Sequence, residues 1–213
     1  MTELTRALDL SGVFANGTLG GVLARASRLD LFGFLVIGIV SGLGGGILRD
    51  TLLQHGTPVA LTDYTYLTVA TAGTLLAFVA DLSRHMSGWA FNVLDASALS
   101  VWAVAGAQKT LAVGLGWLPA VLLGTITAVG GGAIRDLLLA RTPSVFGGTP
   151  LYATVAIVVS AVMVVCSRFG APTVGVLAGI TAGVSLRLAA FHWGWKLPGS
   201  RDWRLGSSRD RDS

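Results

Sequence analysis

Charged residues are scarce in this chain. Asp, Glu, Lys and Arg make up 12% of its 213 residues, whereas 53% are hydrophobic. Soluble domains carry about 25% charged residues, and a water-soluble protein of this size cannot bury so much apolar surface. The composition excludes a soluble globular protein and predicts an all-α integral membrane protein.

Other absences narrow the possible functions. The single Cys166 excludes an internal disulfide. His55, His85 and His192 are scattered without Cys or carboxylate neighbours at metal-ligand spacing, so we expect no metal and no cofactor. No Ser-His-Asp arrangement is suggested, and we do not expect an enzyme. The N-terminus lacks a basic region followed by a small-residue cleavage site, so we expect no removable signal peptide.

The excess of basic residues does not indicate nucleic-acid binding. The net charge is +4, but six of the 15 Lys and Arg residues lie from Arg187 onward and most others flank apolar runs. Basic residues placed in this way are determinants of membrane topology. We therefore expect the lipid bilayer, and no nucleic acid, as a partner.

Long apolar runs dominate the rest of the sequence. A membrane-spanning helix needs about 20 predominantly apolar residues, and short connections rich in Pro, Gly, Ser and Asp separate the candidate spans. The sequence predicts seven transmembrane helices: 8–25, 32–54, 64–82, 91–109, 117–139, 150–167 and 172–191.

One motif occurs twice. Gly44-Gly45-Gly46-Ile47-Leu48-Arg49-Asp50 returns as Gly130-Gly131-Gly132-Ala133-Ile134-Arg135-Asp136, shifted by 86 residues. An ungapped match over two helices is hard to produce by chance, so we infer a duplication. The same shift relates Leu8-Asp9-Leu10-Ser11 to Leu94-Asp95-Ala96-Ser97, Gly20 to Gly106, Gly38 to Gly124, and Leu52-Leu53 to Leu138-Leu139.

The duplication predicts an inverted-topology repeat. Each unit contains three helices, and because three is odd, the second unit enters the membrane from the opposite side. The expected organisation is a first repeat over 1–86, an inverted second repeat over 87–170, a seventh helix over 171–195, and a cytoplasmic, disordered tail over 196–213.

Lys and Arg residues predict the orientation. Under the positive-inside rule, the side with more of them faces the cytoplasm, which places the N-terminus outside and the C-terminus in the cytoplasm of the inner membrane. On the N-terminal side lie Arg6, Lys109 and Arg168; on the other lie Arg25, Arg28, Arg84, Arg141, Arg187, Lys196, Arg201, Arg204, Arg209 and Arg211.

The glycine triplets have two interpretations. Each glycine costs about 1 kcal/mol of helix propensity relative to alanine, so the triplets are expected to bend or open the second and fifth helices near mid-depth. Opened backbone is tolerated in a membrane where it lines water or is buried in protein. The alternative is close helix packing. Two symmetric triplets, each followed by Arg-Asp, favour an element for permeation or binding.

The charged residues of the motifs need partners within the membrane. Adjacent residues on a helix do not face each other, so Arg49 is not expected to pair with Asp50, nor Arg135 with Asp136. Such groups either form structural ion pairs or mark a path for ions or substrate. The inverted topology predicts the pairs Asp9 with Arg49, Asp95 with Arg135, Lys109 with Asp50, and Arg25 with Asp136, in preference to a cross-repeat pair such as Arg49 with Asp136.

The paired Gly-Gly-Gly-x-x-Arg-Asp motifs, the three-plus-three repeat and the seventh helix resemble the prokaryotic TRIC family, the trimeric intracellular cation channels, also known as UPF0126-type membrane proteins. The resemblance covers about residues 8–191. It implies a homotrimer with a pore in each protomer, permeable to potassium and less selectively to sodium. It implies that the second and fifth helices, kinked at Gly44–Gly46 and Gly130–Gly132, line this pore.

The same resemblance implies a gating role for a basic residue in the fourth helix, where Lys109 is the only one. Animal members carry a Lys-Glu-Val signature and bind a phosphoinositide, and this signature does not occur here. Some bacterial relatives are linked to glycine uptake. The alternative function is therefore a small-solute or amino-acid (glycine) transporter that works by alternating access.

Overall fold

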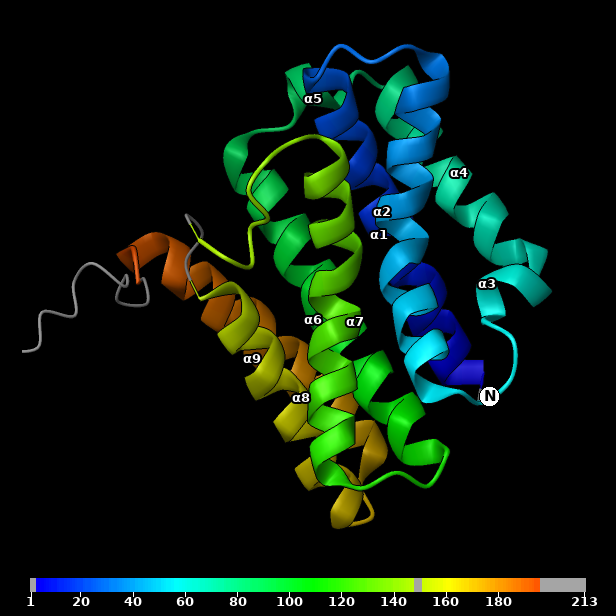
Figure 1. The fold of residues 1–213 in the computed structure, drawn as a ribbon. Coiled ribbons are helices and arrows are strands. Elements are labelled where there is room, and N and C mark those ends of the chain that lie inside the picture. The colour runs from blue at the N-terminus through cyan, green and yellow to red at the C-terminus, as the bar shows by residue number, and fades with distance from the viewer. Residues whose placement is uncertain (1–2, 148–150, 196–213) are drawn as a thin grey trace, which may run out of the picture.

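The computed structural model describes residues 3–147 and 151–195, and this part of the chain is helical, with no strand. The predicted disordered tail over 196–213 lies outside the described residues. The helices are α1 (Glu3–Ala26), α2 (Leu31–Leu53), α3 (Val59–Thr62), α4 (Tyr64–Val79), α5 (Leu82–His85), α6 (Gly88–Ala112), α7 (Trp117–Leu138), α8 (Tyr152–Arg168) and α9 (Pro172–Trp193) (Figure 1).

Each of the seven predicted spans coincides with a long helix. The largest difference is at the start of α1, which begins at Glu3 rather than at residue 8. The helices α1, α2, α6, α7 and α9 are long and apolar enough to cross a membrane, whereas α4 and α8 are apolar but have 16 and 17 residues. The four-residue helices α3 and α5 lie in connections and were not expected.

Local sequence explains where several helices begin and end. Asp30 caps α2 by accepting a hydrogen bond from the amide of Gly33 at 2.7 Å, and Ser87 caps α6 through the amide of Ala90 at 3.1 Å. Asp63 caps α4 and also binds Arg6 at 2.8 Å. Hydrogen bonds from Thr65 and Arg6 hold the pKa of Asp63 below its usual range.

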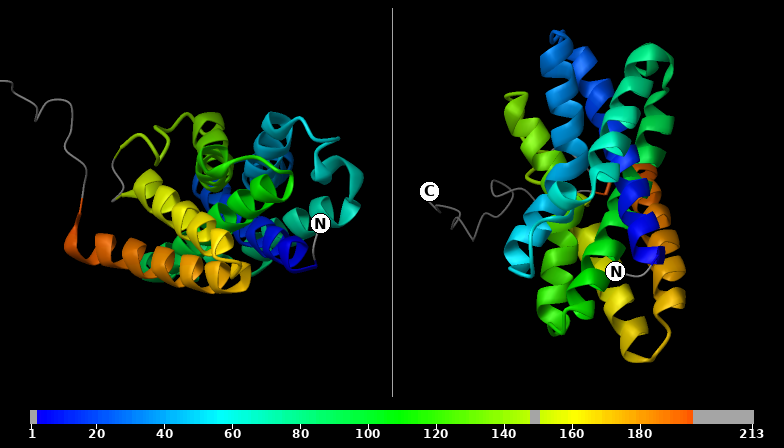
Figure 2. Two further views of the ribbon diagram at one scale, coloured as in Figure 1. Left: turned by 90° about the horizontal axis from the view of Figure 1, so that it is seen from below. Right: turned by 90° about the vertical axis from the view of Figure 1, so that its right-hand side faces the viewer.

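The helices form two bundles that contact each other through the glycine-containing helices (Figures 1 and 2). The helices α1, α2 and α4 pack together, and so do α6, α7 and α8, with α9 against α6 and α8. Between the bundles, α2 packs against α7 and α1 packs against α6. The arrangement places the two Arg-Asp motifs on neighbouring helices, α2 and α7.

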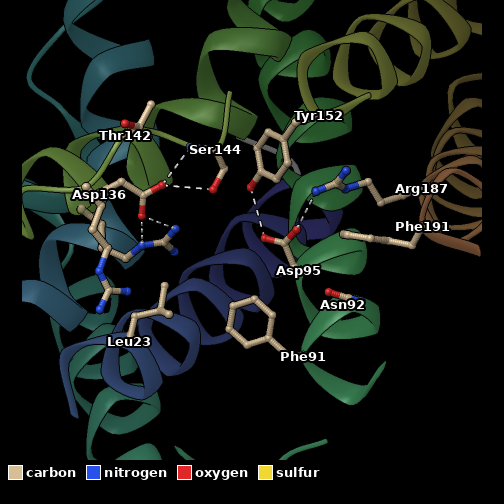
Figure 3. Close-up of a pocket in the computed structure, with 12 residues that line it drawn as sticks. Leu23, Phe91, Asn92, Asp95, Asp136, Thr142, Ser144, Tyr152, Arg187 and Phe191 are labelled. Atoms are coloured by element: carbon tan, nitrogen blue, oxygen red, sulfur yellow. Dashed lines mark hydrogen bonds and ion pairs between the residues drawn. The ribbon is translucent and has the colours of Figure 1, made fainter. Parts of the chain in front are cut away.

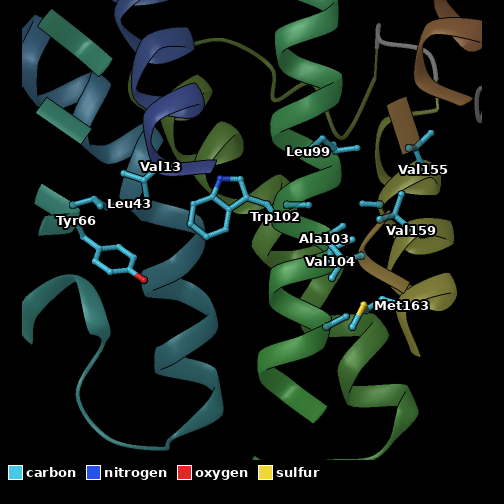
Figure 4. Packing of buried hydrophobic residues seen from close by; sticks show 14 of the residues in the cluster. Val13, Leu43, Tyr66, Leu99, Trp102, Ala103, Val104, Val155, Val159 and Met163 are labelled. Atoms are coloured by element: carbon cyan, nitrogen blue, oxygen red, sulfur yellow. The ribbon is translucent and has the colours of Figure 1, made fainter. Parts of the chain in front are cut away.

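The main apolar core spans both bundles (Figure 4). Trp102 of α6 is 1% exposed and lies between α1 and α2, close to Gly12 and Gly46. Val13 and Tyr66 belong to the same cluster. Because residues of both bundles share one apolar cluster, the bundles form a single packed unit.

The glycine triplets lie where α2 crosses α7, and both helices continue through them without a break. The expectation of an opened turn is therefore wrong, and the expected bend stays a prediction. A Cβ at Gly45 would meet the backbone of Thr127, and one at Gly131 would lie 2.5 Å from the carbonyl oxygen of Ser41. Glycine is required here because the two backbones touch, which is the packing alternative.

The crossing makes a testable distinction within each triplet. Gly45→Ala and Gly131→Ala should destabilise the protein by about 1–3 kcal/mol, because the added methyl group meets backbone. Gly46→Ala and Gly132→Ala are matched controls, since a Cβ there meets only side chains at 3.4 Å or more. The measurement is thermal unfolding in detergent, followed by far-UV circular dichroism. Equal losses at all positions would contradict the crossing.

Candidate functional site

Arg49 near the end of α2 is the centre of the first charged cluster. Its Nη1 and Nη2 atoms donate to the two carboxylate oxygens of Asp9 at 2.9 and 3.1 Å, and Tyr66 donates to Asp9 at 3.3 Å. The side chains of Arg49 and Asp9 are both 0% exposed. Planar two-point pairing is the strongest geometry for these groups. The predicted pair of Asp9 with Arg49 is present.

Arg49 also binds its neighbour, which corrects one prediction. Its Nε donates to Oδ1 of Asp50 at 2.8 Å. The expectation that adjacent residues stay apart considered only the directions of the Cβ atoms. A guanidinium carries five donors at the end of a long side chain, so Arg49 reaches Asp9 with one edge and Asp50 with Nε.

Asp50 connects α2 to two other elements, α6 and α3. Its Oδ1 accepts from Lys109 Nζ at 2.7 Å, so the predicted pair of Lys109 with Asp50 is present. Its Oδ2 accepts a hydrogen bond from the backbone amide of Val59 at 3.0 Å, which connects the segment after α2 to the end of this helix. Lys109 retains 19% side-chain exposure, so this end of the cluster is the accessible one.

Arg135 and Asp136 near the end of α7 form the second cluster. Arg135 Nε and Nη2 both donate to Oδ1 of Asp136, at 2.9 and 2.8 Å, and Nη1 lies 3.5 Å from Ser41 Oγ of α2. Asp136 Oδ2 accepts from the amide of Ser144 at 3.1 Å. The expectation that Arg135 would not pair with Asp136 is wrong for the same reason as at Arg49.

Asp95 is bound differently from its counterpart Asp9. It accepts from Tyr152 at 3.1 Å and from Nη2 of Arg187 at 3.4 Å (Figure 3). The predicted hydrogen bond between Asp95 and Arg135 is absent among the described residues. The reason is α9, which lies outside the repeat and brings a second guanidinium to Asp95.

The predicted pair of Arg25 with Asp136 is also wrong. Arg25 at the end of α1 binds Asp81 at 3.0 Å and the carbonyl oxygen of Phe78 at 2.7 Å. Phe78 lies in the last turn of α4, which packs against α1, and Asp81 follows this helix. Asp136 instead binds Arg135 and Ser144.

Three site residues escaped the sequence analysis. Tyr66 and Tyr152 are separated by 86 residues, so a full comparison of the two repeats would have found them. Arg187 was interpreted as a topology determinant, yet it lies within α9 and is 1% exposed. A basic residue well inside an apolar helix is the signal that was available for it.

The contacts of the first bundle recur in the second at the same spacing. Tyr66 binds Asp9 as Tyr152 binds Asp95, and Thr74 contacts Gly17 as Ser160 contacts Ala103. Each partner is shifted by 86 residues. These two contacts therefore recur between the bundles, although the aspartate–arginine pairing does not.

Two cavities adjoin the charged clusters. The cavity beside Asp50, about 430 Å³, is also lined by Thr5, His55, Gln108 and Lys109 and is called the Asp50 cavity. The cavity beside Asp136 has a volume of about 210 Å³ and is called the Asp136 cavity (Figure 3). Leu23, Phe91 and Phe191 form its apolar lining. Its polar and charged lining consists of Asn92, Asp95, Arg135, Asp136, Arg141, Thr142, Ser144, Tyr152 and Arg187.

The arrangement can hold charge but offers no metal centre in the part of the chain that the structure describes. No group of three or more His, Cys, Asp or Glu residues there has a geometry suited to a metal ion. Asp9 and Arg49 line neither cavity. The Asp9–Arg49 pair and the glycine crossing are thus buried, whereas Asp50 and Asp136 each line a cavity.

A helical membrane protein with buried Arg-Asp clusters is a class that includes channels and transporters. The chain matches the family described as Glycine transporter over residues 6–81 and 92–168. It is 37% identical over 194 residues to the UPF0126 inner membrane protein YadS of Escherichia coli, covering 90% of this chain and 93% of the relative. The chain therefore belongs to this family, the prokaryotic TRIC or UPF0126 family.

Solved structures support the same relationship. The TRIC trimeric intracellular cation channel orthologue from Rhodobacter sphaeroides has a TM-score of 0.83 and 30% identity, and the match covers 91% of this chain and all of that one. A second structure, described in terms of conductance through TRIC cation channels, also has a TM-score of 0.83 and 30% identity. It covers 95% of this chain and 98% of that one.

Because Asp9 and Asp95 are bound differently, their substitution should lower the free energy of unfolding by different amounts. Asp9→Asn should destabilise the protein by about 3 kcal/mol, because it removes the two-point partner of a fully buried guanidinium. Asp95→Asn is the matched substitution and should cost less, about 1–2 kcal/mol, because Arg187 contacts a single Asp95 oxygen at 3.4 Å and Tyr152 can still donate to the amide oxygen. Unfolding in detergent measures both. A larger loss for Asp95→Asn would contradict the assigned pairing.

Proposed function

We propose that this protein is a channel for monovalent cations, permeable to potassium. The pore runs through each protomer from the Asp50 cavity to the Asp136 cavity, between α2 and α7 with their glycine triplets. The observation that carries the proposal is the pair of cavities, each open at one Arg-Asp cluster and separated by the buried crossing of these helices.

Membership of the family supports cation permeation, since the related solved structures are described as cation channels. The Asp50 cavity supports it chemically. Gln108 lines this cavity, and its buried Oε1 has no hydrogen-bond partner among the described residues. In potassium channels carbonyl oxygens of the backbone replace the hydration shell of the ion, and the Gln108 amide oxygen is an uncharged acceptor that can contact a cation in the same way. Potassium and sodium are here the permeating species and not cofactors, and no enzymatic reaction is proposed.

The membrane topology completes the proposal. All seven long helices cross the bilayer, with 1–86 and 87–170 as inverted repeats and 171–195 as the seventh span. The N-terminus is outside and the C-terminus is cytoplasmic. The recurrence of contacts at 86 residues supports the repeats. Although Arg187 is buried in α9 and no longer counts as a flanking charge, the excess of basic residues on the cytoplasmic side remains.

A homotrimer in the inner membrane is part of the same proposal. The relative YadS is described as an inner membrane protein, and the Rhodobacter sphaeroides structure is described as trimeric. Each protomer contains both cavities and both charged clusters, so a pore within the protomer does not require residues from a second copy.

A glycine transporter is the second candidate. The family description names glycine, and the corresponding aspartates of the two repeats have different partners, Arg49 for Asp9 and Arg187 for Asp95. Alternating access between inverted repeats exchanges two such arrangements.

Reconstitution distinguishes the two functions. A channel should give unitary currents in planar bilayers, and reversal potentials in potassium and sodium gradients should follow the cation gradient. A transporter should give saturable, competable glycine uptake into proteoliposomes without unitary currents. Currents that reverse at the chloride potential would contradict both cation permeation and its assignment to this pore.

Lys109 is the proposed gating residue, since it sits on Asp50 at the wall of the Asp50 cavity. A charge that crosses the full membrane field contributes about 2.3 kcal/mol per 100 mV. Lys109→Gln should therefore weaken the voltage dependence and raise the open probability in single-channel records. Arg84→Gln, which removes a charge that is 82% exposed, is the control. Records identical to those of the unmodified protein would remove Lys109 from gating.

A further inference from the structure

The two repeats differ at the edge of the motif arginine. In the first repeat, the Nη1 and Nη2 edge of Arg49 is filled by the carboxylate of Asp9. In the second, Nη2 of Arg135 binds Asp136, and the one described partner of Nη1 is Ser41 Oγ at 3.5 Å, the limit of a hydrogen bond. The Nη1 and Nη2 edge of Arg49 thus binds the carboxylate of Asp9, whereas the same edge of Arg135 has no hydrogen bond to Asp95.

Asp95 does not take this place because α9 holds it. Arg187 lies with its guanidinium carbon 4.5 Å from the ring centre of Tyr152 and 4.3 Å from that of Phe191. Stacking on both rings fixes the guanidinium. From there it binds one oxygen of Asp95, and Tyr152 binds the other. Each Asp95 oxygen therefore has a partner other than Arg135 (Figure 3).

The space beside Arg135 is the Asp136 cavity, and its lining carries an excess of positive charge. Three guanidinium groups face two carboxylates, the latter from Asp95 and Asp136. Arg135 is 4% exposed and Arg187 is 1% exposed, so both charges are poorly solvated and act strongly on a ligand. This lining favours an anionic group beside Arg135.

We propose that the Asp136 cavity binds a small carboxylate, which takes on Arg135 the position that Asp9 takes on Arg49. Guanidinium groups recognise carboxylates by two parallel hydrogen bonds. A volume of about 210 Å³ suits a small ligand such as acetate or a small amino acid. The ammonium group of a zwitterionic amino acid would meet Asp95 or Asp136.

The site stands apart from the proposed channel function. It requires that the ligand enter one cavity and contact Arg135, and it does not require that ions cross the glycine crossing. Loss of carboxylate binding would leave cation currents untouched, and absence of currents would leave carboxylate binding untouched. The two proposals can therefore fail separately.

Isothermal titration of the purified protein in detergent tests the site. Potassium acetate and glycine should each bind and compete with each other, measured against potassium chloride at equal ionic strength. Methylammonium chloride, which has the amine without the carboxylate, should not bind. The proposal is overturned if acetate gives no saturable heat up to tens of millimolar, or if methylammonium binds as well as acetate.

Two variants then locate the binding. Arg141→Gln removes an exposed guanidinium from the cavity lining and should weaken acetate binding several-fold, whereas Arg84→Gln, outside the lining, should not. Asp95→Asn removes a repelling carboxylate and should tighten acetate binding, but glycine should not share this gain because its ammonium group loses a partner. Thermal unfolding confirms that each variant is folded. Acetate affinity that is equal in all of these variants would place binding elsewhere and overturn the proposal.

Discussion

A guanidinium group inside a hydrocarbon layer must be paired, and this requirement organises the structure. Isolated charges at that depth are costly, whereas a paired and hydrogen-bonded charge is tolerated. Arg49 satisfies the requirement completely through Asp9 and Asp50, with 0% of its side chain exposed. To do so it joins α1 to α2, and Asp50 extends the connection to Lys109 on α6. The positions of four elements thus follow from the pairing of one side chain, since Val59 of α3 also binds Asp50.

Sequence periodicity and the repeat spacing predicted much of this arrangement. The seven long helices are visible as apolar runs, and the shift of 86 residues predicts that Asp9 meets Arg49 because both lie toward the same end of neighbouring helices. The sequence did not reveal the partner of Asp95. The repeat argument assumed equivalent environments, but Arg187 comes from α9, which has no counterpart in the repeat, and its effect depends on two aromatic rings.

The glycine triplets show why composition alone leaves the mechanism open. A weak helix former can open a helix or allow another backbone to approach it, and the sequence is the same in both cases. Here tertiary contact decides. Gly45 and Gly131 lie against the backbones of Thr127 and Ser41, and both helices remain intact. The same contact places the crossing between the two cavities, so packing and a role in permeation are compatible.

The seventh long helix, α9, gives the molecule a direction. Two exactly equivalent inverted repeats would present the same chemistry to both sides of a bilayer, and a solute arriving from either side would meet the same groups. Arg187 abolishes this equivalence by binding only one of the two corresponding aspartates. Any flux through the protein should accordingly rectify, because entry from one side begins at an ammonium–carboxylate pair and entry from the other begins at a cluster of guanidinium groups.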